Sequence, residues 1–292
     1  MSPWPEESAM RGIRRTAQAA VQRLRLPFRS RSWRGESGGW TGAGIGNSID
    51  FQDHRPYLPG DDPRYIDWQA YARTGHYTMK LYREEVSPRV DLAFDVSASM
   101  MFDDAKQSRA IELLYFCLES GLRAGSSVRC HMLSGTNCTP WSLDSALAGK
   151  TPPGVGVGAA VTDWSRVPWR QGSLRVVVSD LLFPGSPEPL LAILSHAKGR
   201  GLLLAPYCGA ESDPDWDGNV EFVDCESGSQ RMQHVSPDVR SRFTSAYARH
   251  FGLWKDLSRR HGVLVARVDA APAFLDALQH EPLRLGAVEF IV

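Results

Sequence analysis

Three oxygen-bearing side chains, Asp95, Ser97 and Ser99, follow an apolar run at two-residue steps in the stretch FDVSASM. One of the serines can be a nucleophile, the three oxygens can hold a hard metal ion, or the segment is a polar loop after a strand. A hydrolytic serine normally sits in a G-x-S-x-G turn beside a histidine base. No glycine flanks Ser97 or Ser99 and no histidine motif accompanies them, so the sequence disfavours a serine hydrolase.

A further carboxylate follows a second apolar run. Asp180 comes directly after LRVVVS, residues 174–179, much as Asp95 ends the run LAFD. In a doubly wound sheet, ligands bind beyond the carboxyl ends of the strands, where the strand order reverses. If the two strands are neighbours at that point, two carboxylates and two hydroxyls face one crevice. Oxygen ligands of this kind suit Mg²⁺ or Mn²⁺.

The segments that would position these residues alternate between strand and helix from residue 88 onward. Continuous apolar runs predict buried parallel strands, and apolar stripes at three- and four-residue steps predict helices. We expect strands at 90–96, 126–133, 138–143, 174–183, 201–207 and 263–268, the second and third forming a hairpin. We expect helices at 105–124, 187–198, 237–261 and 271–280, an exposed hairpin at 220–235 and an edge strand at 286–292. The predicted fold class is α/β, a doubly wound, mostly parallel, Rossmann-like sheet.

The first 87 residues differ in composition from the rest. Residues 8–26 have an amphipathic pattern that ends at Pro27, which predicts a helix docked on the body of the protein, with a membrane-surface or partner helix as the alternative. Asp62 and Pro63 predict the start of a helix that runs through Tyr71, and a strand follows within 76–85. We therefore divide the chain into three parts: a basic helix and linker at 1–40, an extension packed on the sheet at 41–87, and the α/β domain at 88–292.

Composition argues against several functional classes. Lys plus Arg and Asp plus Glu both number 33, so the formal charge of zero gives no global field for nucleic acid. No run approaches the roughly 20 apolar residues of a membrane span, and the N-terminus lacks the apolar core of a signal peptide. Five cysteines without a CxxC pair suit a reducing cytoplasm. The glycine-rich stretches 42–46 and 154–158 lack the strand–turn–helix context of a nucleotide fingerprint.

The stretch DVSASM, residues 95–100, matches the D-x-S-x-S motif of von Willebrand factor type A domains, the metal-ion-dependent adhesion site. The resemblance implies that Ser97 and Ser99 ligate the ion and that Asp95 holds it through water. Asp180 matches a later aspartate of that family, which acts in the same way. The resemblance also implies a type A-like sheet.

The loop before Asp180 departs from the type A pattern. That family has a threonine there, in G-G-T-x-x-G-A-A-L, and Val155 takes its place when residues 154–161 are aligned with the pattern. Thr151 or Thr162 substitutes only if the loop follows another path. A site that holds Mg²⁺ or Mn²⁺ and a metal-free site therefore both stay open.

The upstream block FQDHRPYLPGDDPRYIDW, residues 51–68, resembles the signature of the bacterial domain-of-unknown-function-fifty-eight family, R-P-Y-x-P-G-D-D-x-R-x-I-D-W. ART at 72–74 and YREE at 82–85 continue the match, which covers roughly residues 40–283. Within the block we expect Arg55, Arg64, Asp67 and Arg73 to form a buried or half-buried lattice of salt bridges that supports the architecture, with direct ligand binding as the alternative.

That resemblance also implies a partner. Genes of this family usually sit beside genes for MoxR-type AAA+ ATPases, so the type A domain would recruit a client protein or couple ATPase work to its maturation. A partner's carboxylate would complete the coordination of the ion. A metal-free scaffold with the same partner is the alternative. We expect a cytoplasmic adaptor that is not an enzyme.

Overall fold

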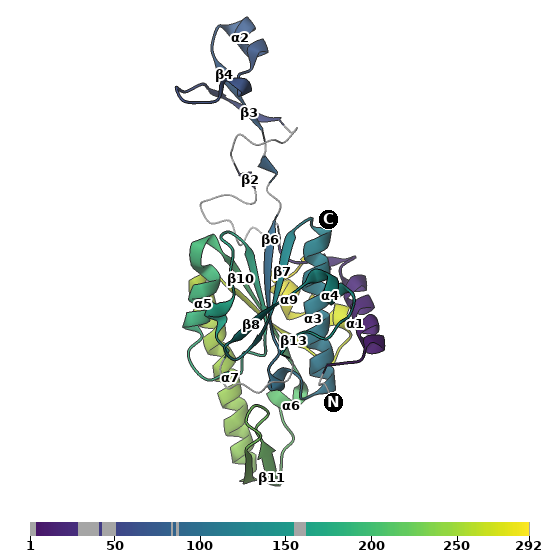
Figure 1. The fold of residues 1–292 in the computed structure, drawn as a ribbon. Helices are drawn as coiled ribbons and strands as arrows, with labels where there is room; N and C mark the ends of the chain where they lie inside the picture. The colour runs from purple at the N-terminus through teal and green to yellow at the C-terminus, as the bar shows by residue number, and fades with distance from the viewer. Residues whose placement is uncertain are drawn as a thin grey trace. The chain divides into compact units, whose positions relative to one another are not determined.

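The computed structural model describes residues 4–28, 41–42, 51–82, 84–85, 88–154 and 162–291 (Figure 1). The chain divides into two compact units. The larger unit joins Met1–Ser30 to Arg89–Val292, and the smaller unit is Arg31–Pro88. The predicted serine and aspartate site lies in the larger unit.

A six-stranded, mostly parallel sheet forms the centre of the larger unit (Figure 1). Its strands lie in the order β13–β10–β9–β6–β7–β8; β8 pairs antiparallel with β7, and the other neighbours pair in parallel. The bounds are Arg89–Asp95 for β6, Ser127–Ser134 for β7, Asn137–Trp141 for β8, Leu174–Val178 for β9, Arg200–Tyr207 for β10 and Leu264–Asp269 for β13. Every residue of β9 is buried, Arg175 included, which explains its nearly continuous apolar run. The predicted mixed α/β class with a mostly parallel sheet is confirmed.

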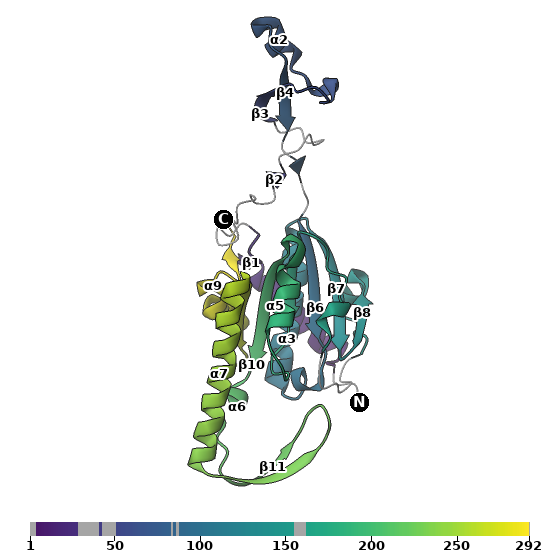
Figure 2. The ribbon, with the colours of Figure 1, turned by 90° about the vertical axis from the view of Figure 1, so that its left-hand side faces the viewer.

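Helices cover both faces of this sheet, with α3 and α1 on one face and α5 and α7 on the other (Figures 1 and 2). The helices are α1 Glu7–Ala20, α3 Asp104–Arg123, α4 Leu143–Leu147, α5 Glu188–Ser195, α6 Gly209–Ser212, α7 Pro237–His261, α8 Phe274–Gln279 and α9 Glu281–Arg284. Short 3₁₀ turns are η3 Ala98–Met100, η4 Trp164–Arg166 and η5 His196–Lys198. The four helices predicted after residue 88 are present as α3, α5, α7 and α8, although α5 and α8 are shorter than predicted.

The N-terminal helix is also shorter than its amphipathic pattern suggested. It ends at Ala20, and Leu24–Arg25 (β1) instead pairs antiparallel with Glu289–Phe290 (β14). The predicted C-terminal edge strand therefore lies beside β1 and not on the central sheet. Helix α1 packs on α3, where Arg14 Nε donates to a Glu119 carboxylate oxygen at 2.8 Å.

The strand predicted at 174–183 stops at Val178, because the chain turns at Ser179 and Asp180. Leu181 adopts a left-handed conformation, with φ at 60°, and its side chain is fully buried in the core cluster that contains Trp254. The apolar character of residues 181–183 thus reflects packing beyond the strand end. This turn fixes the direction in which Asp180 points.

The predicted exposed hairpin is present as β11, Gly218–Val223, and β12, Gln230–Val235, joined by a turn at 224–229. It forms a two-stranded sheet of its own. Figure 2 shows it leaving the foot of α7, with its tip turning back toward the central sheet.

The smaller unit pairs β3, Phe51–Pro56, with β4, Thr78–Tyr82, and β2, Thr41–Gly42, with β5, Glu84–Glu85. The single helix predicted from Pro63 through Tyr71 is instead two elements. Asp62 caps the 3₁₀ turn η2, Pro63–Tyr65, and Asp67 caps α2, Trp68–Thr74. The interruption follows from this second cap, because the Asp67 carboxylate accepts hydrogen bonds from the amides of residues 69 and 70.

The expected ion-pair lattice of this block is a set of local pairs. Arg55 makes two 2.7 Å bonds to Asp61, which lower the pKa of that carboxyl to about 2. Arg64 pairs with Asp62, and Asp67 pairs with His54 at 2.8 Å. Arg73 Nε donates to a backbone carbonyl of its own helix. These contacts hold the turn and the helix start of the block.

Candidate functional site

The predicted residues meet at the point where the strand order reverses. The chain passes from β6 to β7 on one side, and β9 then lies on the other side of β6. Register places Phe94 of β6 opposite Val178 of β9, so Asp95 and Asp180 follow at the same edge of the sheet. The arrangement predicted from the two apolar runs is therefore present, and it sits where doubly wound sheets bind ligands.

Asp95 is only 3% exposed and is held by neutral donors of Ser97 and Ser179. One oxygen, Oδ1, accepts from the Ser97 amide at 3.0 Å, and the other, Oδ2, accepts from the Ser179 hydroxyl at 2.7 Å. Burial and then the nearby Asp180 carboxylate raise the pKa of Asp95 to about 6. The neutral groups that bond to Asp95 therefore compensate its negative charge poorly.

The two serines line a cavity of about 510 Å³ together with Asp95 and Asp180. The chain turns directly after Ser97 into η3, and the Ser97 and Ser99 hydroxyl oxygens lie 3.2 Å apart. The other lining residues are Thr162, Leu182, Phe183, Pro184 and the hairpin tip at 224–227. All four residues predicted as ligands thus face one space.

The described threonines of the loop differ in position. Val155 lies outside the described residues. Thr162 is 7% exposed and lines the cavity, whereas Thr151 is exposed and is not among the residues that line it. Of the two threonines considered as substitutes, Thr162 is thus the one beside the serines.

Lys106 belongs to this site, and sequence reasoning missed it. Its side chain is fully buried, and Nζ donates to Asp180 Oδ2 at 2.8 Å and to a carboxylate oxygen of Glu211 on α6. Burial disfavours the ammonium, but the two carboxylates outweigh it and raise the pKa of Lys106. A sequence signal existed: Lys106 lies four residues before Ala110 and eight before Leu114, on the apolar stripe of α3. A charged residue on such a stripe needs a buried partner.

The hairpin tip also reaches the site. Glu226 Oε1 accepts a hydrogen bond from the Ser99 amide at 2.9 Å. No simple sequence pattern predicts this contact, because the two residues are 127 positions apart. The described lining residues include no histidine, so no imidazole base lines the cavity beside Ser97 or Ser99 there. His-assisted serine chemistry therefore finds no support in the cavity.

The described residues also contain no cluster of three or more His, Cys, Asp or Glu placed to hold a metal ion, so any ion here would depend on the hydroxyls.

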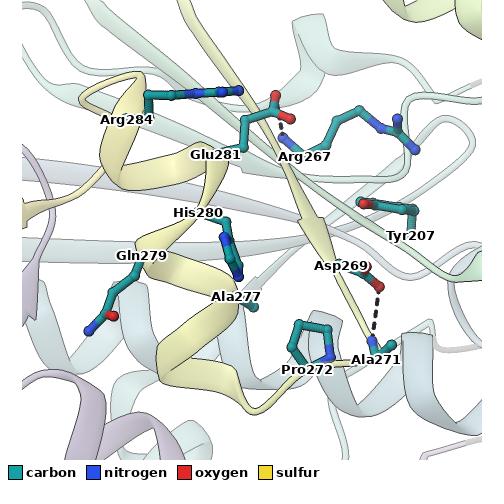
Figure 3. A pocket seen from close by; sticks show the side chains of 10 residues that line it. All are labelled: Tyr207, Arg267, Asp269, Ala271, Pro272, Ala277, Gln279, His280, Glu281 and Arg284. Carbon is teal, nitrogen blue, oxygen red and sulfur yellow. Dashed lines mark hydrogen bonds between the residues drawn. The ribbon is translucent and has the colours of Figure 1, made fainter.

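A larger pocket of about 920 Å³ opens at the carboxyl ends of β10 and β13, beside α8 and α9 (Figure 3). Its Arg267 guanidinium lies 3.9 Å from the Tyr207 ring centroid and donates to the Tyr247 hydroxyl at 2.7 Å. Glu281 accepts from the Arg267 amide, and Asp269 accepts from another backbone amide. These groups bind one another across the pocket wall, and none of the residues predicted for chemistry lies there.

The family model described as protein of unknown function DUF58 matches residues 53–252. The chain belongs to this family. The match starts within the block that resembled the DUF58 signature and continues through most of α7, so that prediction is confirmed. Uncharacterized proteins of Mycobacterium bovis and of two Mycobacterium tuberculosis strains are 29% identical to it over 215 residues, which span 68% of this chain and 67% of theirs.

Two solved structures resemble this DUF58 chain. One is an aerotolerance-related membrane protein from Bacteroides fragilis, with 13% identity and a TM-score of 0.36, covering 67% of this chain and 98% of that one. The other is the conserved hypothetical protein BatB from Bacteroides thetaiotaomicron, with 12% identity and a TM-score of 0.35, covering 68% and 98%. In the part of the present chain that is described, no helix combines the length and apolarity needed to cross a membrane.

Proposed function

We propose that this protein is a non-enzymatic adaptor with a von Willebrand factor type A-like domain, which recognises a partner protein through Mg²⁺ or Mn²⁺ held at the edge of β6 and β9. One observation carries the proposal: Asp95, Ser97, Ser99 and Asp180 all line a single cavity at the reversal point of the sheet.

The donor set fits a small, hard divalent cation. Two oxygen ligands at right angles around Mg²⁺ lie about 3 Å apart, given bonds of about 2.1 Å. The hydroxyl oxygens of Ser97 and Ser99 are 3.2 Å apart without an ion. Asp95 carries a buried charge that neutral hydrogen bonds leave poorly compensated, as expected for a carboxylate that faces a cation.

The residues would divide the binding between them. Ser97 and Ser99 would ligate the ion directly, and Asp95 and Asp180 would hold it through water. Thr162, which lines the cavity, would take the place of the threonine that the type A pattern has at the position of Val155. When bound, the ion supplies a Lewis-acidic position that a partner's carboxylate completes. Ser179 and the Ser97 amide orient Asp95 for this task through the two hydrogen bonds already described.

The partner of this proposal is a MoxR-type AAA+ ATPase acting on a client protein in the cytoplasm. This part is supported by the family resemblance, because genes for such ATPases usually sit beside those of this family.

A metal-free scaffold with the same partner is the second candidate, and Lys106 favours it. Its ammonium already gives Asp180 a cationic partner at 2.8 Å, so the fold of this edge does not require an ion. Both candidates use the same cavity and differ in whether divalent cations matter.

Melting with and without divalent ions separates the two candidates. An ion present at 100 times its Kd stabilises a protein by about 2.7 kcal/mol, which raises the Tm of a domain of this size by several degrees. We expect that rise with Mg²⁺ or Mn²⁺ in the wild type and in the control Ser195→Ala, which lies in α5 away from the cavity, and its loss in Ser97→Ala/Ser99→Ala. Capture of the ATPase should then require Mg²⁺. No ion effect on melting, with capture unchanged in EDTA, would establish the metal-free scaffold instead.

A further inference from the structure

The tip of the β11–β12 hairpin is an ordered turn. The Asp224 carboxylate accepts from the Glu226 amide at 3.0 Å, from the Ser227 amide at 2.7 Å and from the Ser227 hydroxyl at 2.9 Å. Gly228 completes the turn with φ at 68°, and its amide donates to the Asp224 carbonyl. The tip therefore presents its side chains in a fixed arrangement.

This ordered tip enters the candidate site. Asp224, Cys225, Glu226 and Ser227 all line the cavity that contains the predicted ligands. The Glu226 carboxylate accepts from the amide of Ser99, whose own hydroxyl is one of those ligands. A carboxylate of the chain itself thus stands where the proposed partner's carboxylate would arrive.

The hairpin is packed at its base and more exposed toward its tip. At the base, Val235 lies opposite Gly218 and is 1% exposed. The Trp216 ring lies 4.9 Å from both Phe222 of β11 and Phe243 of α7, whereas Val223, the last residue of β11 before the tip, is 55% exposed. An isolated two-stranded hairpin is marginally stable in water. The tip can therefore leave the cavity while the base stays packed on α7.

We propose that Glu226 is an internal ligand of the cavity, whose carboxylate holds the Ser99 amide until an acidic segment of the partner protein displaces it. The inference rests on the proposed function, because it takes the cavity as the partner-binding site. It applies with or without an ion, because Glu226 bonds to a backbone amide.

The exchange defines the chemistry of the partner segment. A carboxylate of the partner that replaces the Glu226 carboxylate carries the same charge. The net charge of the cavity, which several acidic residues line, therefore does not change. Leu182 and Phe102 beside the site are 39% and 49% exposed, and the Phe102 ring centroid lies 5.0 Å from Lys106 Nζ. The segment should accordingly carry an acidic residue next to an apolar one.

Binding of the tip in trans tests this inference. The probe is a fluorescein-labelled peptide with the sequence of residues 221–230, added to the full chain in Mg²⁺ and followed by anisotropy. A hydrogen bond to a charged acceptor favours the state in which Glu226 occupies the cavity over the state in which the tip has left it, by a factor of roughly ten or more. Glu226→Ala should therefore bind the peptide about tenfold more tightly than the wild type. The control Glu221→Ala, exposed in the same hairpin, should bind as the wild type does.

Two further measurements make the result decisive. A peptide with Glu226→Gln should bind more weakly to the Glu226→Ala protein, and the Ser99 amide of that protein should exchange with deuterium about tenfold faster than in the wild type. Equal peptide affinity for wild type and Glu226→Ala, with unchanged exchange at Ser99, overturns the internal ligand and leaves the proposed function standing. Failure of the peptide to bind any variant, with unchanged exchange at Ser99, likewise overturns the internal ligand, whereas the proposed function is overturned only by its own melting and capture experiments.

Discussion

Lys106 brings a fixed positive charge into the candidate site, and Lys106→Met measures what that charge contributes. Methionine keeps a long apolar stem in the buried position but removes the ammonium. Asp180 and Glu211, whose side chains are 5% and 11% exposed, then lose their shared cation. Breaking a buried ion pair by removing one partner costs about 3–5 kcal/mol. Because the cavity beside Asp180 admits water, we expect a loss at or somewhat below the lower end of this range, about 2–3 kcal/mol.

Urea denaturation in EDTA at neutral pH gives the cleanest comparison. With a slope of about 3 kcal/mol per molar urea for a unit of this size, the midpoint should fall by about 1 M. Lys150→Met, at an exposed position, is the matched control and should change stability by no more than about 0.5 kcal/mol. If the site also takes a divalent ion, Mg²⁺ should restore more stability to Lys106→Met than it adds to the wild type.

Adding Asp180→Asn to Lys106→Met separates charge from packing. Neutralising the stranded carboxylate should recover part of the lost stability, because the two positions interact directly. A double variant as unstable as Lys106→Met would attribute the loss to packing of the stem. An unchanged midpoint in Lys106→Met itself would refute the reasoning that the ammonium compensates the two carboxylates.

Two further predictions concern stability. Burial and Asp180 raise the pKa of Asp95 from 3.8 in the unfolded chain to about 6 in the folded chain. Between these pH values the folded chain binds more protons than the unfolded chain, so the stability of the fold falls as the pH rises. The loss of stability is complete above about pH 6. In EDTA, Asp95→Asn should therefore be about 1–3 kcal/mol more stable than the wild type at pH 7.5 and no more stable at pH 3.5, in urea titrations at both pH values; a destabilised variant at pH 7.5 contradicts this. Gly121→Ala would place its Cβ 2.7 Å from Val128 Cγ2 and should cost about 1–3 kcal/mol, whereas Gly12→Ala, with open space at its Cβ, should not destabilise. Equal denaturation midpoints for the two alanine variants would refute that packing argument.

The sequence predicted the features that depend on local pattern. The segments VDLAFDV and LRVVV are buried on both faces, and strands buried in this way are mostly apolar. Their apolar runs can be read from the sequence without knowing which segments pack against them. The 3.6-residue stripe of α3 and the full length of α7 follow in the same way. The D-x-S-x-S spacing identified the residues that line the cavity because a strand end and a turn are both local.

The remaining features depend on contacts between distant residues. Lys106 meets partners 74 and 105 positions away, and Ser99 meets Glu226 127 positions away. Helix α1 stops early because Leu24 and Arg25 pair with residues at the other end of the chain. Apolarity alone also misled the prediction of the strand at 174–183, because Leu181 is buried in a turn. Periodicity indicates that a residue is buried but does not identify what it contacts.

The two carboxylates of the site are compensated differently, and this difference explains why one geometry is compatible with both candidate functions. Asp180 receives a full positive charge from Lys106, whereas the hydrogen bonds described for Asp95 come from a neutral amide and a neutral hydroxyl. Neutral donors satisfy its oxygens but do not cancel its charge, and its raised pKa follows. A divalent ion would thus act chiefly on Asp95. Substitution of Asp95 is therefore the sharper test of ion dependence, because replacing Asp180 also disturbs the Lys106 pair and mixes the two effects.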